Sequence, residues 1–340
     1  MMTLLLAGSL FLCGGDVSEI PEVLAGGAKY FVGGKVIDPF VAMKKAGWNF
    51  VRFRVWNDPH GEWCDKAHTL AAAKLAHAQG LKISLDFHYS DYWADPGKQN
   101  KPKAWKDLPF DALVTALHDY TKDVVSAMVK QGTPPIMVQV GNEITPGMLW
   151  PDGRNDSPEG WHRLARLVRA GCEAVKESSP QIDTMIHLDR GGDNKTAVWW
   201  FDQLKKEGVD FDLIGLSYYP WWHGSLKALQ ANLNDLAARY HKDVYVVETS
   251  YPWEPESAAS PETFKGGKLE PGFAPSPEGQ AAFLRRVAEI VREVPEGRGK
   301  GLLYWAPTWI SEPGRRGGWS SLILFDHEGH ALPGFAAMGQ

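Results

Sequence analysis

Two glutamates that each end an apolar run are the residues of this chain best suited to catalysis. Glu143 ends the run 136–143 and Glu248 ends the run 244–248, and an aromatic-rich loop follows each of them. Two carboxyl groups at strand ends can act as proton donor and nucleophile when their environments separate their pKa values. With tryptophans nearby to pack on the apolar faces of sugar rings, the pair predicts cleavage of a glycosidic bond.

Polar residues close to the two glutamates suit the same chemistry. Asn142 directly precedes Glu143, so it can contact a sugar 2-hydroxyl while Glu143 protonates the glycosidic oxygen. In the run 51–59 the two-residue repeat of a strand puts Arg52 and Arg54 on one side. Two inward cations need carboxylate neighbours. Arg52 is therefore predicted to hold Glu248 ionised and oriented, and the alternative is a purely structural ion pair.

Loops too polar or too aromatic for packing alone supply further candidates for substrate contact. His88 is predicted to donate a hydrogen bond to a sugar or to a catalytic carboxylate, and Asp86 to orient its neighbours. Either Tyr218 or Tyr219 is predicted to hydrogen-bond the nucleophile. The full set of predicted substrate-binding residues is Arg52, His88, Asp91, Trp93, Asn142, Tyr218, Tyr219, Trp221, Trp222, Trp305 and Trp309.

Short apolar runs alternate with longer amphipathic stretches along the whole chain, a pattern typical of parallel strands joined by helices. Strands are predicted near residues 10–15, 50–55, 82–87, 136–141, 184–188, 213–217, 244–248 and 301–305. Helices are predicted near residues 37–47, 66–79, 110–131, 158–178, 195–207, 225–241 and 277–294. The alternation indicates an α/β fold, a single-domain (β/α)8 TIM barrel, whose active site lies at the C-terminal ends of the strands.

Composition agrees with one enzyme domain acting on a neutral substrate. A chain of 340 residues suits one barrel, and 15 tryptophans are available for a cleft. The formal net charge is −5 and no block of Lys or Arg occurs, so neither nucleic acid nor an anionic membrane is a predicted partner. The three cysteines are predicted to be free, partly buried thiols, with Cys64 the most exposed.

The N-terminal segment is predicted to lie outside the barrel. The apolar run 4–13 resembles part of a signal peptide, but no Lys or Arg precedes it. It is also shorter than the roughly 20 apolar residues that span a bilayer. Residues 1–9 are predicted to be a remnant leader or a disordered end, and residues 10–340 to form the barrel domain.

Several segments, in order along nearly the whole chain, closely resemble glycoside hydrolase family 53, the endo-β-1,4-galactanases, which are retaining enzymes of clan A. The matching segments are 15–18, 51–59, 86–97, 141–151, 217–224, 248–253 and 321–326. The resemblance implies a (β/α)8 barrel with Glu143 as acid/base and Glu248 as nucleophile. It also implies double-displacement cleavage of internal β-1,4 bonds in galactan or type I arabinogalactan, the galactan side chains of pectin.

The resemblance also bears on cofactors, location and partners. Bacterial relatives often carry calcium in the loops after strands 7 and 8, but no such ligand cluster is found in 254–276 or 310–320. Neither calcium nor any other cofactor is therefore predicted. A polymeric substrate implies a secreted or periplasmic enzyme, and a monomer is expected. The long loop 254–276 is predicted to shape distal subsites.

Three alternatives stay open from the sequence. Another clan A endo-glycanase, such as a mannanase or a cellulase, would share both glutamates and the barrel. A metal-dependent barrel hydrolase would use His88, His187 and His223, and loss of activity with a chelator would reveal it. A catalytically silent carbohydrate-binding barrel would bind glycans without releasing new reducing ends.

Overall fold

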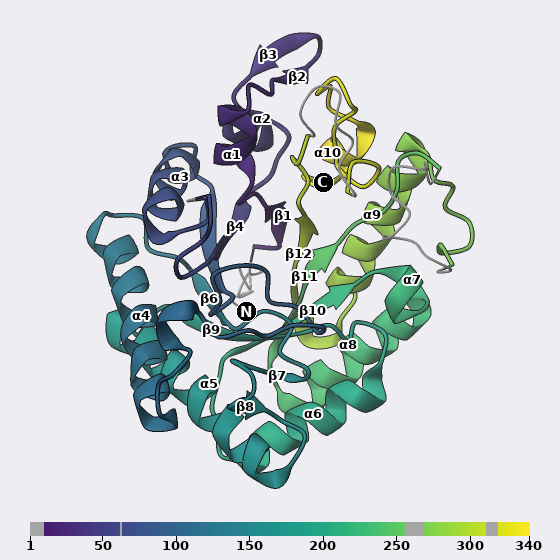
Figure 1. Ribbon diagram of the computed structural model, residues 1–340. Helices are drawn as coiled ribbons and strands as arrows, with labels where there is room; N and C mark the ends of the chain where they lie inside the picture. The colour runs from purple at the N-terminus through teal and green to yellow at the C-terminus, as the bar shows by residue number, and fades with distance from the viewer. Residues whose placement is uncertain (1–9, 62, 256–267, 311–318) are drawn as a thin grey trace, which may run out of the picture.

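The fold is a closed barrel of parallel strands surrounded by helices (Figure 1). The computed structural model describes residues 10–61, 63–255, 268–310 and 319–340. The predicted leader 1–9 and much of the loops 254–276 and 310–320 lie outside the described residues. Around the barrel the strands follow the order β1-β12-β11-β10-β9-β6-β5-β4, and β1 pairs in parallel with both β12 and β4 to close it. The predicted (β/α)8 barrel is confirmed.

The barrel strands occupy the predicted runs to within a few residues. They are β1 (Leu12–Asp16), β4 (Phe50–Val55), β5 (Lys82–Phe87), β6 (Met137–Val140), β9 (Asp183–Leu188), β10 (Leu213–Tyr218), β11 (Asp243–Thr249) and β12 (Gly299–Trp305). Nearly all of their residues are buried, because a parallel strand in a barrel packs on one face against the helices and on the other against the interior.

The long helices also match their predicted positions. They are α2 (Pro39–Lys45), α3 (Lys66–Ala78), α4 (Phe110–Lys130), α5 (Pro158–Ser178), α6 (Asn194–Lys206), α8 (Leu226–Tyr240) and α9 (Pro277–Arg292). Ser157 and Ser276 cap α5 and α9, each accepting a hydrogen bond from a backbone N–H of the first turn. Of the helices in the described ranges, none combines the length and apolar character needed to cross a bilayer.

Several short elements have no counterpart in the sequence-based prediction. They are α1 (Ile20–Ala25), β2 (Tyr30–Val32), β3 (Lys35–Ile37), η1 (Lys103–Trp105), β7 (Gly147–Met148), β8 (Gly153–Arg154), α7 (Pro220–His223), η2 (Pro295–Gly297) and α10 (Pro333–Ala337). Elements this short do not complete enough turns or strand repeats to show a periodic pattern. The β2–β3 hairpin meets the C-terminal segment, where Phe31 pairs with His330.

The inside of the barrel has an apolar end and a polar end. A small apolar cluster fills the apolar end and consists of Leu12, Phe50, Met137, Met185, Leu213, Tyr245, Val247 and Leu303. Toward the C-terminal ends of the strands the buried side chains become polar or charged, and they include Asp16, Arg52, Arg54, Asp86, Gln139, His187 and Glu248. Buried charges are stable only when paired, so this end is built around ion pairs.

The prediction that Cys64 is the most exposed cysteine is wrong. Its side chain is buried beside Ser18, and burial raises the pKa of the Cys64 thiol to about 11. Cys13 and Cys172 are also buried, and all three thiols are free. Cys64 packs against β4 and the start of α1, where it lines a small cavity with Pro21 and Arg54.

Candidate active site

Glu143 and Glu248 meet at the polar end of the barrel, as predicted. Glu248 lies near the end of β11, and Glu143 lies in the turn after β6, where it adopts a left-handed φ of 47°. One carboxylate oxygen of each lies within 4.8 Å of the other. The Ser217 hydroxyl on β10 lies between them, 2.6 Å from Glu143 Oε1 and 3.5 Å from Glu248 Oε2.

Glu248 is held by a cation and a phenol. Arg52 Nη2 donates to Glu248 Oε1 at 2.7 Å, and the Tyr219 hydroxyl donates to Oε2 at 3.2 Å. The Arg52 Nε also donates to Asp16 at 2.9 Å, so the guanidinium is itself fixed. The predicted contact between Arg52 and the nucleophile candidate is confirmed. Arg52 is fully buried behind Glu248, so its inclusion among residues that touch substrate is wrong.

The two carboxyl groups have different electrostatic surroundings. Burial raises the pKa of Glu248 to about 7, although the Arg52 guanidinium opposes the rise. Burial, then the charges of Glu248 and Asp189, raise the pKa of Glu143 well above 4.5, and Ser217 opposes that rise only through a hydrogen bond. Since Arg52 favours the ionised form of Glu248, Glu143 holds the proton while Glu248 ionises. This is the division that an acid and a nucleophile require.

The separation of the carboxyl groups indicates how they can react. Retaining glycosidases hold the two groups about 5–5.5 Å apart, whereas inverting enzymes need about 6.5–9.5 Å to admit a water molecule. An oxygen-to-oxygen approach within 4.8 Å falls on the retaining side. The geometry therefore suits direct attack by Glu248 on a sugar carbon.

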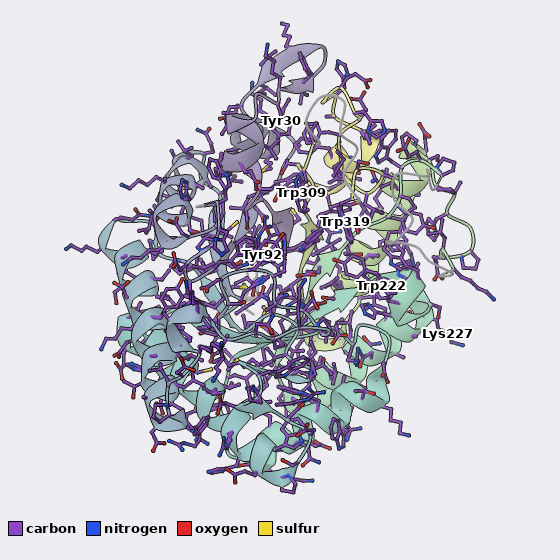
Figure 2. The ribbon with its side chains drawn as sticks, in the orientation of Figure 1. Tyr30, Tyr92, Trp222, Lys227, Trp309 and Trp319 are labelled. Carbon is purple, nitrogen blue, oxygen red and sulfur yellow. The ribbon has the colours of Figure 1, made fainter. Side chains whose placement is uncertain are left out.

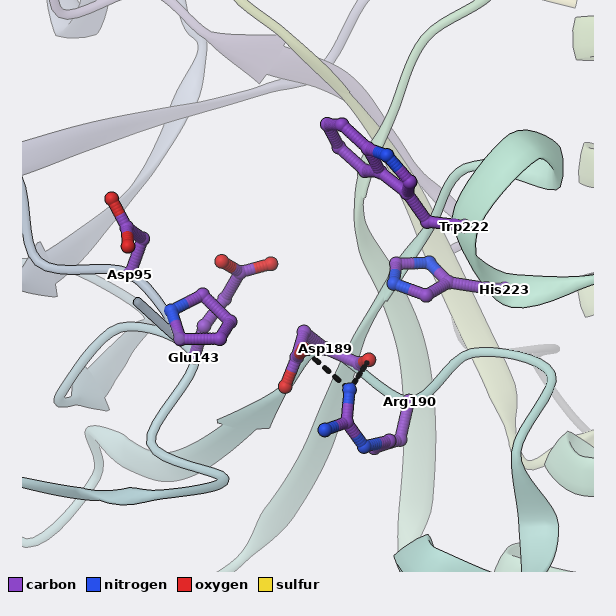
Figure 3. Close-up of a pocket in the computed structure, with 7 residues that line it drawn as sticks. Asp95, Glu143, Asp189, Arg190, Trp222 and His223 are labelled. Atoms are coloured by element: carbon purple, nitrogen blue, oxygen red, sulfur yellow. Dashed lines mark hydrogen bonds and ion pairs between the residues drawn. The ribbon is translucent and has the colours of Figure 1, made fainter. Parts of the chain in front are cut away.

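A pocket of about 410 Å³ opens beside Glu143 (Figure 3). It is lined by Asp95, Pro96, Glu143, Asp189, Arg190, Trp222 and His223. Trp222 is 56% exposed, so much of its ring is open to solvent where it lines the pocket. An open ring next to a proton donor is suited to hold the sugar that leaves with the protonated oxygen.

A second group of aromatic rings is formed by residues outside the lining of this pocket. Trp93 lies against Trp305 and stacks on Trp309, with ring centroids 5.7 Å and 6.0 Å apart. The Arg54 guanidinium lies 4.3 Å from the centre of the Trp93 ring. Figure 2 shows Trp309 and Tyr92 inside the ring of helices. Trp93, Trp305 and Trp309 are only half-buried, so part of each ring is open to solvent. Their contact with substrate stays a prediction.

Two of the predicted substrate-binding aromatics are placed elsewhere. Tyr218 is fully buried, donates its hydroxyl to the Gly224 carbonyl and stacks on Phe283 of α9, so its prediction is wrong. Trp221 is 8% exposed and packs against Tyr219, so it does not line an open subsite. Along β10 alternate side chains point to opposite faces, which turns Tyr218 outward while Tyr219 points to the interior.

Polar residues predicted to touch substrate are largely engaged with protein. Asp91 accepts backbone N–H groups of Asp58 and Lys103, so it ties two loops together. His88 accepts the backbone N–H of Ala94 at Nδ1, and its Nε2 lies 3.5 Å from Asp86. Both ring nitrogens of His88 thus face atoms other than the two glutamates.

Asn142 lies beside Glu143 but has its own partners. It donates from Nδ2 to the Ala94 carbonyl at 2.8 Å, and its Oδ1 lies 3.0 Å from His187 Nδ1. Ser217 and Gln139 were not singled out from the sequence, and His187 was named only as a ligand of the metal-dependent alternative. Their inward positions on β10, β6 and β9 follow the two-residue repeat from known inward neighbours, which is the signal that could have found them.

One group of side chains in the described part of the chain has the arrangement of metal ligands. It consists of Glu143, His187 and Glu248, with one donor atom of each within 4.8 Å of the others. Both His187 nitrogens already lie within hydrogen-bond distance of protein atoms, and Arg52 already neutralises Glu248. The absence of a metal cofactor stays a prediction.

The fold is a (β/α)8 barrel, and at the C-terminal ends of its strands two glutamates lie close together in different electrostatic surroundings, with partly exposed tryptophans nearby. These features define a glycoside hydrolase. Comparison with known proteins agrees with this class and identifies the family within it. The chain belongs to glycosyl hydrolase family 53, whose family model matches residues 12–338.

Individual relatives match over most of their lengths. The chain is 46% identical over 96% of its length to an uncharacterized protein of Niallia circulans, 93% of which is covered. It is 39% identical over 84% of its length to the arabinogalactan endo-β-1,4-galactanase of Thermothelomyces thermophilus, 86% of which is covered. The solved Ignisphaera aggregans GH53 catalytic domain has a TM-score of 0.90 at 37% identity, with 96% of this chain and 95% of that chain covered.

Proposed function

We propose that this protein is a retaining endo-β-1,4-galactanase that hydrolyses internal bonds of galactan and type I arabinogalactan, the galactan side chains of pectin. The observation that carries the proposal is the close approach, within 4.8 Å, of Glu143 and Glu248 in a family 53 barrel. The galactanase name of the Thermothelomyces thermophilus relative supports the choice of polysaccharide. Half-buried and exposed tryptophans, Trp222 among them, suit a polysaccharide that runs across the site.

The first chemical step forms a covalent sugar–enzyme bond. The Glu248 carboxylate, held by Arg52 and Tyr219, attacks the anomeric carbon while Glu143 gives its proton to the glycosidic oxygen. The bond between that carbon and the oxygen breaks, and the protonated part of the polymer leaves. Trp222, which lines the pocket beside Glu143, can hold the sugar that leaves.

The second step returns the enzyme to its starting state. Glu143, now a carboxylate, takes a proton from water, and the resulting hydroxide attacks the anomeric carbon. The bond to Glu248 breaks, Glu248 leaves as a carboxylate and the sugar is released with its original anomeric configuration. Glu143 therefore has to be neutral in one step and ionised in the other.

Reducing-end release from linear β-1,4-galactan tests the substrate assignment. The assay is run beside β-mannan, xylan and carboxymethyl-cellulose, for the wild type and for Glu143→Ala. Galactan-only release that disappears in the variant is the expected result. Activity on another glycan would overturn the substrate in favour of a different clan A glycanase. Binding of galactan without new reducing ends would favour a carbohydrate-binding barrel.

Chemical rescue tests the separate roles of the glutamates. Glu248→Ala is expected to lose turnover with the fold intact, and added azide or formate should restore part of the rate by replacing the nucleophile. Circular dichroism of the variant checks the fold. Substantial galactan cleavage by Glu248→Ala without a rescuing anion would contradict the role of Glu248.

The proposed mechanism uses no metal ion. Treatment with EDTA is therefore expected to leave the rate of galactan cleavage unchanged. Loss of activity that is restored by a divalent cation would favour a metal-dependent hydrolase that uses His88, His187 and His223. His223 accepts the backbone N–H of Tyr219 in the structure, so its Nδ1 is engaged with protein.

The proposal extends to where and in what state the enzyme works. Galactan is a polymer, so the enzyme acts in the medium or the periplasm, as a monomer with the polysaccharide as its partner. Fractionation of cells that produce the protein, followed by the galactan assay, tests the location. Light scattering during gel filtration tests the monomer, with a mass near 37.7 kDa expected.

A further inference from the structure

A continuous series of buried hydrogen bonds links Arg52 to Glu143. Arg52 Nη1 donates to Gln139 Oε1 at 3.0 Å, and Gln139 Nε2 lies 3.0 Å from His187 Nδ1. His187 Nε2 lies 2.8 Å from the Ser217 hydroxyl oxygen, which lies 2.6 Å from Glu143 Oε1. Gln139 and Ser217 are buried and His187 is 0% exposed, so each contact must be matched within the protein.

The direction of this series is set at its Arg52 end. A guanidinium only donates, so the oxygen of the Gln139 amide must face Arg52 and its NH₂ group must face His187. Burial and the nearby charge of Arg52 lower the pKa of His187 well below 6.5, which makes the imidazole neutral. A neutral imidazole has one N–H and one lone pair. With Gln139 donating to Nδ1, the proton is on Nε2 and is donated to Ser217.

Asn142 competes at the same ring nitrogen. Its Nδ2 donates to the Ala94 carbonyl, so its Oδ1 faces His187 Nδ1, also at 3.0 Å. A proton on Nδ1 would satisfy Asn142, but the Ser217 hydroxyl would then donate to the Nε2 lone pair. An ionised Glu143 would lose its donor. The ionised state of Glu143 therefore selects the tautomer with the proton on Nε2.

We propose that Gln139, His187 and Ser217 are positioning residues that form a hydrogen-bond chain from Arg52 and stabilise the carboxylate form of Glu143. The proposal rests on the proposed function only in that Glu143 is the acid/base. Hydrogen bonds aligned in one direction polarise one another, so each link strengthens the next. Because Arg52 also binds Glu248, one cation supports the nucleophile directly and the acid/base through three side chains.

The chain supports the step in which Glu143 must be a base. Most other groups around Glu143 favour its neutral form: burial, the charges of Glu248 and Asp189, and more weakly Asp95. The charged or titratable groups that also border it are Arg190, His223 and Tyr219. Ser217 is the hydrogen-bond donor that opposes those effects. Without this hydrogen bond the pKa of Glu143 would be higher still. Glu143 would then be ionised, and able to take a proton from water, only at higher pH.

The first test measures the pKa of Glu143 in the full-length protein by NMR of ¹³C-labelled glutamate carboxyl groups. The parent is Glu248→Gln, so that titration of Glu248 does not contribute, and the Glu143 signal is assigned by its loss in Glu143→Gln. Ser217→Ala is expected to raise the pKa of Glu143 by roughly one pH unit, the effect of losing a hydrogen bond to a charged group.

A variant remote from Glu143 separates a chain from a local contact. Gln139→Met removes the link between Arg52 and His187 without touching either glutamate, and it is expected to raise the pKa of Glu143 by a smaller amount. Ser321→Ala is the control, since it removes a buried hydroxyl that has no hydrogen-bond partner among the residues that the structure describes. If the pKa of Glu143 rises in Ser217→Ala but is unchanged in Gln139→Met, the proposed hydrogen-bond chain is wrong. It is also wrong if neither variant changes that pKa.

A second measurement leaves every residue of the hydrogen-bond chain unchanged. In ¹⁵N spectra of histidine-labelled protein, His187 is expected to carry its proton on Nε2 at a pH where Glu143 is ionised. A proton on Nδ1 at that pH would overturn the proposal. Neither NMR result depends on galactan cleavage, so failure of the proposed function would leave both standing. In active enzyme, Ser217→Ala should also move the alkaline limb of kcat/KM to higher pH.

Discussion

Replacing Glu248 by glutamine is expected to stabilise the folded protein at alkaline pH and to abolish its activity. Glu248 is 5% exposed, and burial raises its pKa from 4.5 to about 7. A carboxyl group whose pKa is raised by folding binds its proton more tightly in the folded state. Its contribution to stability is therefore fully present below about pH 4.5 and is lost as the pH rises to about 7.

The size of the effect follows from the two pKa values. Each unit of difference corresponds to about 1.4 kcal/mol, so ionised Glu248 costs roughly 3 kcal/mol of stability at pH 8 and little at pH 4. That figure already contains the attraction of Arg52. In Glu248→Gln the guanidinium keeps Asp16 at 2.9 Å and Asp86 at 3.8 Å, so no unpaired cation is left. The substitution therefore removes the free-energy cost of burying the ionised carboxylate of Glu248.

Urea unfolding at pH 4 and pH 8, followed by tryptophan fluorescence and circular dichroism, measures the change. Glu248→Gln should be more stable than the wild type by roughly 3 kcal/mol at pH 8, with a much smaller difference at pH 4. Glu173→Gln, an exposed substitution on α5, is the matched control and should show no such difference. Equal differences at the two pH values, or a less stable Glu248→Gln at pH 8, would refute the reasoning.

Three further substitutions test how the site is built, each by steady-state kinetics on galactan. Tyr219→Phe removes the 3.2 Å hydrogen bond to Glu248, so kcat should fall roughly tenfold while KM changes little; a changed KM alone would contradict this. Trp222→Ala should raise KM about fivefold, whereas Trp199→Ala, equally a surface tryptophan, should not. Gly141→Ala, at φ 89°, should cost roughly 1–3 kcal/mol in urea unfolding and lower kcat by displacing the next turn; wild-type stability would argue against strain.

Local rules explain why the sequence alone determines so much of this protein. Apolar runs of strand length alternating with amphipathic runs set the order of strands and helices, since each element must bury one face. Caps such as Ser157 fix helix starts through contacts three residues away. In a parallel barrel all strand ends lie on one face. The positions of Glu143 and Glu248 after their runs were therefore enough to bring them together.

Distances across the barrel were decided only by tertiary structure. Ser217 and Tyr219 face the interior while Tyr218 faces α9, because the pleat of β10 and its register with β11 choose the side. The raised pKa of Glu143 comes from burial and from charges that other segments bring close, Glu248 on β11 and Asp189 after β9.

The link from Arg52 to Glu143 likewise joins side chains of β4, β6, β9 and β10, which lie far apart in the sequence. Sequence periodicity predicts which residues can point inward. Only the closed barrel sets which inward atoms come within hydrogen-bond distance, because that depends on strand order, register and packing together.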